Sequence, residues 1–132
     1  MWFGKPTIES PDLGTLSFSH GRWHSRPIRT NAGEVLIALE GDATSPAAAA
    51  ITLVKEVLGD ARAFVQPAIA FASADSRTQE FIGGNGDLQL DGFTIGAVPP
   101  SFRVELALSE WPDAMITVVF SGKVPCEILL AD

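Results

Sequence analysis

The sequence predicts an α+β fold in which a single antiparallel, strongly curved sheet carries a central helical segment on one face. Two runs near the C-terminus, residues 102–108 and 116–120, place apolar side chains at every second position, the pattern of strands with one buried side. Residues 45–74 are rich in alanine and repeat apolar side chains at helical spacing. Further alternating runs precede residue 42, so strands, helices and strands are expected in that order within one domain, residues 1–132.

The N-terminal third predicts a meander of three strands. Residues 13–18 and 22–28 are expected to form a hairpin around a turn at residues 19–21. A second turn at residues 31–33 contains Asn and Gly, which favour turns, and it precedes a third alternating run at residues 35–39.

A first helix is expected to begin near Pro46, because proline is tolerated in the first helical turn and Thr44 or Ser45 precedes it as a possible N-cap. The helix should end near Leu58, with Gly59 in the left-handed conformation that often follows a helix.

A second helical segment is expected after Asp60, which we interpret as its cap. Pro67 lacks the N–H group that a helix interior needs, so it predicts a kink or a break. Residues 73–80 are polar and residues 83–86 are glycine-rich, and together they predict a flexible connection back to the sheet.

The C-terminal part predicts strands at residues 88–95, 102–108, 116–120 and 127–130. A bulge is expected at Asp91-Gly92, an end of the first of these strands at Pro99-Pro100, and a loop at residues 109–113. The predicted core shared by sheet and helices is Ile51, Val54, Leu58, Phe64, Val104, Leu106, Val118 and Phe120.

Composition narrows the classes of function. Apolar residues make up 46% of the chain and charged residues 19%, which is typical of a folded domain. The formal net charge of −7 disfavours nucleic acid and anionic membranes as partners. No apolar run is long enough to span a membrane, residues 1–5 lack the pattern of a signal peptide, and the single cysteine excludes an internal disulfide, so we expect a cytoplasmic protein.

Residues able to bind metals or act as nucleophiles stand alone or at uninformative spacing. His20 and His24 are four apart, which on a strand separates them by about 13 Å. Cys126 lies beside Glu127 in a late apolar strand, where a free cysteine is expected to be buried and slow to react. We therefore expect no metal and no cofactor.

Two further patterns are also interpreted as structural. The carboxylate pairs Glu40 with Asp42 and Glu110 with Asp113 lack the regular oxygen spacing of a calcium loop, so we interpret them as solvated turns. The glycine-rich residues 83–86 are followed by a strand, whereas phosphate-binding loops are followed by a helix. No catalytic residue is predicted.

Two surfaces are candidates for binding a partner. The first is a basic and aromatic ribbon, residues 22–29, because tryptophan and arginine often anchor protein interfaces; alternatively, its tryptophan covers the core and its arginines pair with carboxylates of the same chain. The second is the acidic surface of residues 75–132, a segment that contains nine carboxylates and only three basic side chains. The candidate partner-binding residues are Arg22, Trp23, Arg26, Glu110 and Asp113.

The segment DLGTLSF at residues 12–18 resembles the opening of small uncharacterised bacterial α+β domains, some of them suspected toxin-immunity proteins. An early tryptophan, a central helical segment and a closing Leu-Leu-Ala-Asp extend the likeness in outline over most of the chain. The resemblance implies a binding protein, and it supplies no catalytic residues.

Composition and resemblance together predict a non-enzymatic domain that binds another protein, in the manner of an immunity protein that neutralises a basic toxin. A small enzyme or ligand-binding domain, whose polar groups converge only in three dimensions, is the alternative. A deep cleft containing His20, His24 or paired carboxylates would favour this alternative, and a flat acidic face would favour the binding protein.

Overall fold

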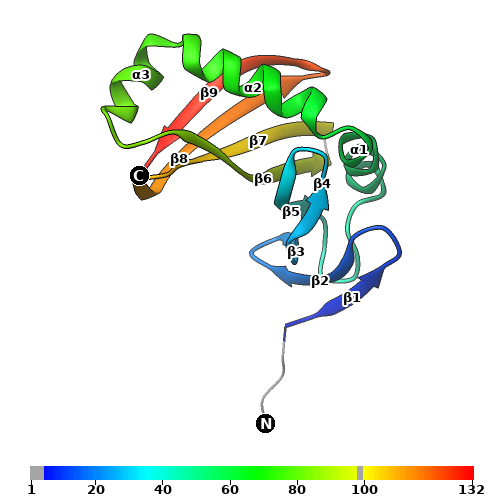
Figure 1. The fold of residues 1–132 in the computed structure, drawn as a ribbon. Helices are drawn as coiled ribbons and strands as arrows, with labels where there is room; N and C mark the ends of the chain where they lie inside the picture. Colours follow the sequence, from blue (N-terminus) through cyan, green and yellow to red (C-terminus); the bar gives the residue numbers. More distant parts are fainter. Residues whose placement is uncertain (1–4, 98–99) are drawn as a thin grey trace.

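The computed structural model describes residues 5–97 and 100–132, in which nine strands and three helices form an α+β fold (Figure 1). The α+β class predicted from the sequence is confirmed. The strands are β1 (Thr7–Ser10), β2 (Gly14–Ser19), β3 (Arg22–Ser25), β4 (Ile28–Thr30), β5 (Gly33–Glu40), β6 (Leu88–Ala97), β7 (Pro100–Leu108), β8 (Trp111–Ser121) and β9 (Val124–Ala131). The helices are α1 (Ala48–Gly59), α2 (Arg62–Ala74) and α3 (Ser76–Ile82).

The sheet is mostly antiparallel but not wholly so. Its strand order is β1-β2-β3-β5-β6-β7-β8-β9, and β4 pairs with β5 beside this path. All pairs are antiparallel except β5 with β6, which are parallel. The prediction of a purely antiparallel sheet was wrong here because the chain leaves β5, crosses through all three helices and returns to run beside β5 in the same direction. Figure 1 shows β4 and β5 running steeply across the view and β7, β8 and β9 at a shallower slant, so the strand direction changes along the sheet.

The helices cover one face of the sheet, as predicted. Helix α1 contacts β5, β6 and β7, and α2 contacts β7, β8 and β9. The core lies between these layers, and six of the eight predicted core side chains are buried in it, while Ile51 and Leu58 are half-buried at its margin. Phe64 of α2 packs edge-to-face on Phe102 of β7, with 5.2 Å between ring centres.

The turn residues determine the geometry of the N-terminal β2–β3 hairpin. Between β2 and β3, His20 and Gly21 both have positive φ, 53° and 77°, which is the geometry of tight hairpin turns. The expected strand at residues 22–28 is divided into β3 and β4 on either side of Pro27, and β1 was not predicted.

Helix α1 begins two residues later than expected, after Ala47, which makes no side-chain cap. The carboxylate of Asp42 instead accepts the backbone N–H groups of Thr44 and Ser45, and Pro46 forms an isolated bridge with Gly41. Residues 41–46 are therefore a tight turn that precedes the helix. The expected left-handed Gly59 was also wrong, because this glycine is the last helical residue of α1.

Helix α2 is continuous through Pro67, so the predicted break does not occur. Four side chains of this helix are buried against the sheet, and their packing holds the helix together across the missing hydrogen bond. Asn31 in the β4–β5 turn provides a hydrogen-bond acceptor for the first turn of α2. Its side-chain amide accepts the backbone N–H of Arg62 and donates to the carboxylate of Asp60, both at 2.8 Å. Asp60 was thus wrongly predicted as the cap.

Helix α3 replaces the flexible connection expected at residues 73–80. Asp75 caps this helix by accepting the backbone N–H of Thr78 at 3.0 Å, and Gly83 ends it in the left-handed conformation. The backbone bond from Thr78 holds the pKa of Asp75 below its ordinary value of 3.8.

The C-terminal strands form a second meander. The predicted bulge is confirmed as a register shift between Leu90 and Gly92. The predicted loop at residues 109–113 is shorter than expected, since β8 already begins at Trp111. Strand β6 ends at Ala97 and β7 begins at Pro100, while Pro99, which was expected to end the strand, lies outside the described residues.

Candidate functional site

In the described part of the chain, the three helices lie on one face of the sheet, and we call the opposite face the open face (Figure 1). The strand register defines its membership, because residues directly opposite each other on neighbouring strands share a face. One row across the sheet is Leu36, Gly92, Glu105, Thr117 and Leu129. The open face further includes Arg22, His24, Ala38, Thr94, Arg103 and Met115.

Large apolar side chains gather on the open face. Within residues 5–97 and 101–132, five large apolar residues are exposed: Leu36, Phe71, Met115, Val124 and Leu129. Three of these five, Leu36, Met115 and Leu129, lie on the open face, with 45%, 38% and 39% of their surface exposed. A gathering of this kind on one face is typical of a surface that contacts another molecule.

Glu105 lies in β7 at the centre of the row. One of its carboxylate oxygens accepts the hydroxyl of Thr94 on β6 at 3.1 Å, and the other accepts the hydroxyl of Thr117 on β8. Thr117 is buried and Thr94 is half-buried, so the two neighbouring strands fix the orientation of the carboxylate. These donors are neutral, and Glu105 forms no ion pair with any side chain that the structure describes.

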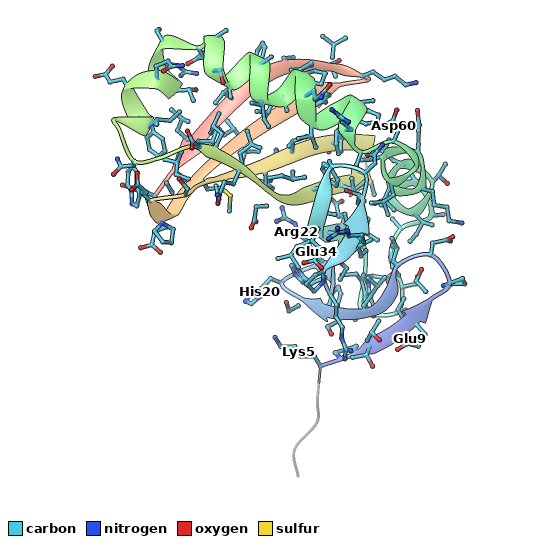
Figure 2. All side chains as sticks on the ribbon, viewed as in Figure 1. Lys5, Glu9, His20, Arg22, Glu34 and Asp60 are labelled. Carbon is cyan, nitrogen blue, oxygen red and sulfur yellow. The ribbon has the colours of Figure 1, made fainter. Side chains whose placement is uncertain are left out.

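A groove of about 440 Å³ opens on this face beside Glu105. Arg22, His24 and Ser25 of β3 line one side, and Leu36 of β5 and Met115 of β8 contribute apolar surface. Asp91, in the bulge of β6, adds a second carboxylate. Figure 2 shows Arg22 on the side of the sheet away from the helices, and His20 at the tip of the β2–β3 turn.

The charged groups of the groove are free of ion pairs with other described side chains. Only three ion pairs occur in the part of the chain that the structure describes: Lys55 with Asp12, Arg77 with Asp75, and Lys123 with Glu56. All three lie outside the open face, and their side chains are exposed except for the half-buried Asp75.

The structure separates the five predicted partner-binding residues. Trp23 is fully buried, and its indole N–H donates to the backbone carbonyl of Asp42 at 2.8 Å, so it belongs to the core and offers no contact surface. Arg22 lines the groove and Arg26 is exposed beyond the end of β3. Glu110 is exposed in the β7–β8 turn and Asp113 is exposed near the start of β8, and β5 and β6 separate β3 from β7 in the sheet.

The two histidines lie on different elements. His20 lies in the β2–β3 turn, whereas His24 is on β3, where its Nε2 atom lies 3.3 Å from the backbone carbonyl of Ser19. Among residues 5–97 and 100–132, no three His, Cys, Asp or Glu side chains form a group that could hold a metal ion.

Cys126 is exposed, so the expectation of a buried thiol was wrong. The register of β9 against β8 shifts at this point, since Val119 lies opposite Glu127 and Phe120 lies opposite Pro125. Cys126 is the additional residue of this bulge, and the shift in side-chain alternation directs it to solvent. Its Sγ atom lies 3.4 Å from the backbone carbonyl of Val119.

One residue of each predicted carboxylate pair takes part in a turn. The N–H groups of Thr44 and Ser45 lower the pKa of Asp42 below its ordinary value of 3.8, because they stabilise the charged form. Glu110 donates its backbone N–H to the carbonyl of Asn85 at 3.0 Å, which ties the β7–β8 turn to the segment after α3.

Sequence reasoning did not find Glu105, Thr94 or Thr117. The alternation in residues 102–108 and 116–120 placed Glu105 and Thr117 on the side away from the core, which was the available signal. Bringing the three together also requires the pairing register of β6, β7 and β8.

Comparison of the chain with protein-family models, with curated proteins and with solved structures finds no match in any of the three. In the described part of the chain, none of the helices has the length and apolar character needed to cross a membrane.

Proposed function

We propose that the chain is a non-enzymatic domain that binds another protein, and that the open face is its docking surface. The observation that supports this most directly is the exposure of Leu36, Met115 and Leu129 on the sheet face opposite the helices, with Leu36 and Met115 lining one groove. Burying such apolar side chains against a partner removes them from water and stabilises the complex.

The size of the open face favours a partner that offers a narrow segment. Leu36 and Leu129 lie four strand spacings apart in the same row, a separation of about 19 Å. Such a row is long enough to contact a strand or a helical turn, and each side of a standard interface buries roughly 800 Å². Contacts around the rim would add the remaining area.

A toxin-immunity role is the form of this proposal that the sequence resemblance suggests. The net charge of −7 would accelerate encounter with a basic partner, an effect that salt weakens. The anchoring contacts would then determine how slowly the complex dissociates.

A small-ligand or enzymatic site is the second candidate, and the groove containing His24, Asp91 and Glu105 is the observation that favours it. It ranks second because the two groups of the groove that could act as nucleophile and base have other partners. The hydroxyl of Ser25 accepts the backbone N–H of Ile37 at 2.9 Å, and the Nε2 atom of His24 lies 3.3 Å from the backbone carbonyl of Ser19.

Site-specific photo-crosslinking in the native cell tests the docking surface. A crosslinking amino acid replaces Leu36 or Met115 on the open face, and the matched controls replace Phe71 on α2 or Val124 on β9, which are also exposed and apolar. We expect a discrete protein adduct from the open-face positions and none from the controls.

Adducts of equal yield at the control positions would contradict the proposed surface. Absence of protein adducts at the open face, together with a small molecule that stays bound during purification, would support the second candidate instead. Mass spectrometry of the purified chain distinguishes these outcomes.

A further inference from the structure

We propose that the groove beside Glu105 binds a basic side chain, lysine or arginine, that anchors the partner segment. This inference rests on the proposed function and names the chemistry of the contact. It is carried by the unpaired carboxylate of Glu105, by the apolar side chains next to it, and by the hydrogen bonds that hold the carboxylate in place.

The carboxylate of Glu105 has acceptor capacity to spare. An ionised carboxylate accepts up to about four hydrogen bonds, and the hydroxyls of Thr94 and Thr117 occupy two of these positions. Both donors are neutral, so they orient the carboxylate without cancelling its charge. A guanidinium or ammonium group entering the groove would supply the missing charge-assisted hydrogen bonds.

The apolar side chains of the groove match the stem of such a residue. Leu36 and Met115 line the same groove as Glu105 and are exposed to 45% and 38%. Lysine and arginine cover apolar surface with their methylene groups while their charged heads reach a polar partner. An acidic side chain lacks such a long stem and would meet the like charges of Glu105 and Asp91.

Cations of this chain also lie near the groove, and their positions restrict how the partner can enter. Arg22 lies opposite Glu40 in the β3–β5 register, so a carboxylate of the same chain is its direct neighbour. Arg103 is two residues from Glu105 on β7, in the next row of the open face. Both arginines would repel a basic side chain that approaches past them. The basic side chain of the partner is therefore expected to enter the groove past Leu36 and Met115.

Binding of short peptides to the folded protein tests this anchor without knowledge of the partner. The probes are acetyl-Leu-Arg-Leu-amide and the same peptide with citrulline, which has nearly the shape of arginine but no charge. The chain has two methionines, so labelling of methionine methyl groups gives two signals, of which one reports Met115 in the groove.

We expect the arginine peptide to shift the Met115 signal in a saturable manner, and the citrulline peptide to bind about tenfold more weakly. Glu105→Gln should abolish this difference between the peptides while keeping an acceptor and a donor for the two threonines. Glu110→Gln removes the same charge at the β7–β8 turn and should leave the difference unchanged.

Equal affinity of the two peptides for the wild-type protein would overturn the anchor, and this comparison needs no variant to fold. Persistence of the difference in Glu105→Gln, or its loss in Glu110→Gln, would overturn it as well. Any of these results combined with open-face photo-adducts would leave the docking surface standing and remove only its basic anchor. Absence of the photo-adducts would remove the docking surface itself.

Discussion

Gly92 of β6 lies opposite Leu36 of β5 in the parallel pair that joins the two halves of the sheet, and its replacement by alanine tests this pairing. A Cβ atom at residue 92 would lie 2.0 Å from the backbone oxygen of Leu36 and 2.9 Å from its carbonyl carbon. Ordinary contact begins near 3.4 Å. The β5 backbone would therefore have to move away from β6 by about 1.4 Å.

A movement of that size is incompatible with the hydrogen bonds that join β5 to β6 around Leu36 and Gly92. Loss of about two backbone bonds, at about 1–3 kcal/mol each, predicts that Gly92→Ala lowers the free energy of unfolding by about 2–6 kcal/mol. That is a large fraction of the 5–15 kcal/mol that roughly spans the stability of natural domains.

Urea denaturation followed by tryptophan fluorescence measures this difference, since the chain has three tryptophans and Trp23 is buried beside the junction strand β5. The matched control is Gly59→Ala at the end of α1, where an added Cβ meets nothing within 4 Å. We expect Gly59→Ala to be neutral or stabilising by up to about 1 kcal/mol. A Gly92→Ala protein within about 1 kcal/mol of the wild type would refute the close junction.

Leu106→Ala should lower the free energy of unfolding by about 2–5 kcal/mol in the same urea assay, because Leu106 is fully buried; a change below about 1 kcal/mol would contradict its place in the core. Asn31→Ala removes the two hydrogen bonds that satisfy the start of α2 and should destabilise by about 1–2 kcal/mol, whereas no change would show that water replaces them. Because the pKa of Asp75 is lowered in the folded chain, its contribution to stability is complete above pH 3.8 and is lost as the pH falls through the lowered folded value. The stability difference between wild type and Asp75→Ala should accordingly narrow in acid, and a difference that is constant with pH would contradict the cap. Cys126 should react with iodoacetamide to one adduct per chain in native buffer, counted by intact-mass spectrometry; labelling only after addition of denaturant would contradict its exposure.

Local pattern was sufficient for most strands but not for the ends of the helices. The alternation in residues 102–108 and 116–120 identified β7 and β8 because their side-chain period is set by the strand itself. The start of α1 was misplaced because the side chain of Asp42 organises residues 41–46 into a turn. The start of α2 depends on Asn31, which lies in a distant turn that no local pattern connects with Arg62.

The candidate site was less predictable than the fold for the same reason. Trp23 combined the features of an interface anchor with those of a core residue, and only its burial decides between them. Glu105 was visible merely as a polar position in an alternating strand. Its role as the centre of the open face depends on β6 and β8, which place Thr94 and Thr117 on either side.

The parallel pairing of β5 with β6 also determines the order in which the chain can acquire its structure. Strands β1–β5 and strands β6–β9 each pair mostly with close neighbours in sequence, so each meander can form from local contacts. The junction joins Leu36 to Gly92 across all three helices, and its closure carries the largest loop entropy. During synthesis β5 leaves the ribosome well before β6. The edge of β5 that later pairs with β6 then has no partner, and β5 carries the apolar residues Val35, Ile37 and Leu39. Until β6 is made, this edge is open to pairing with another chain.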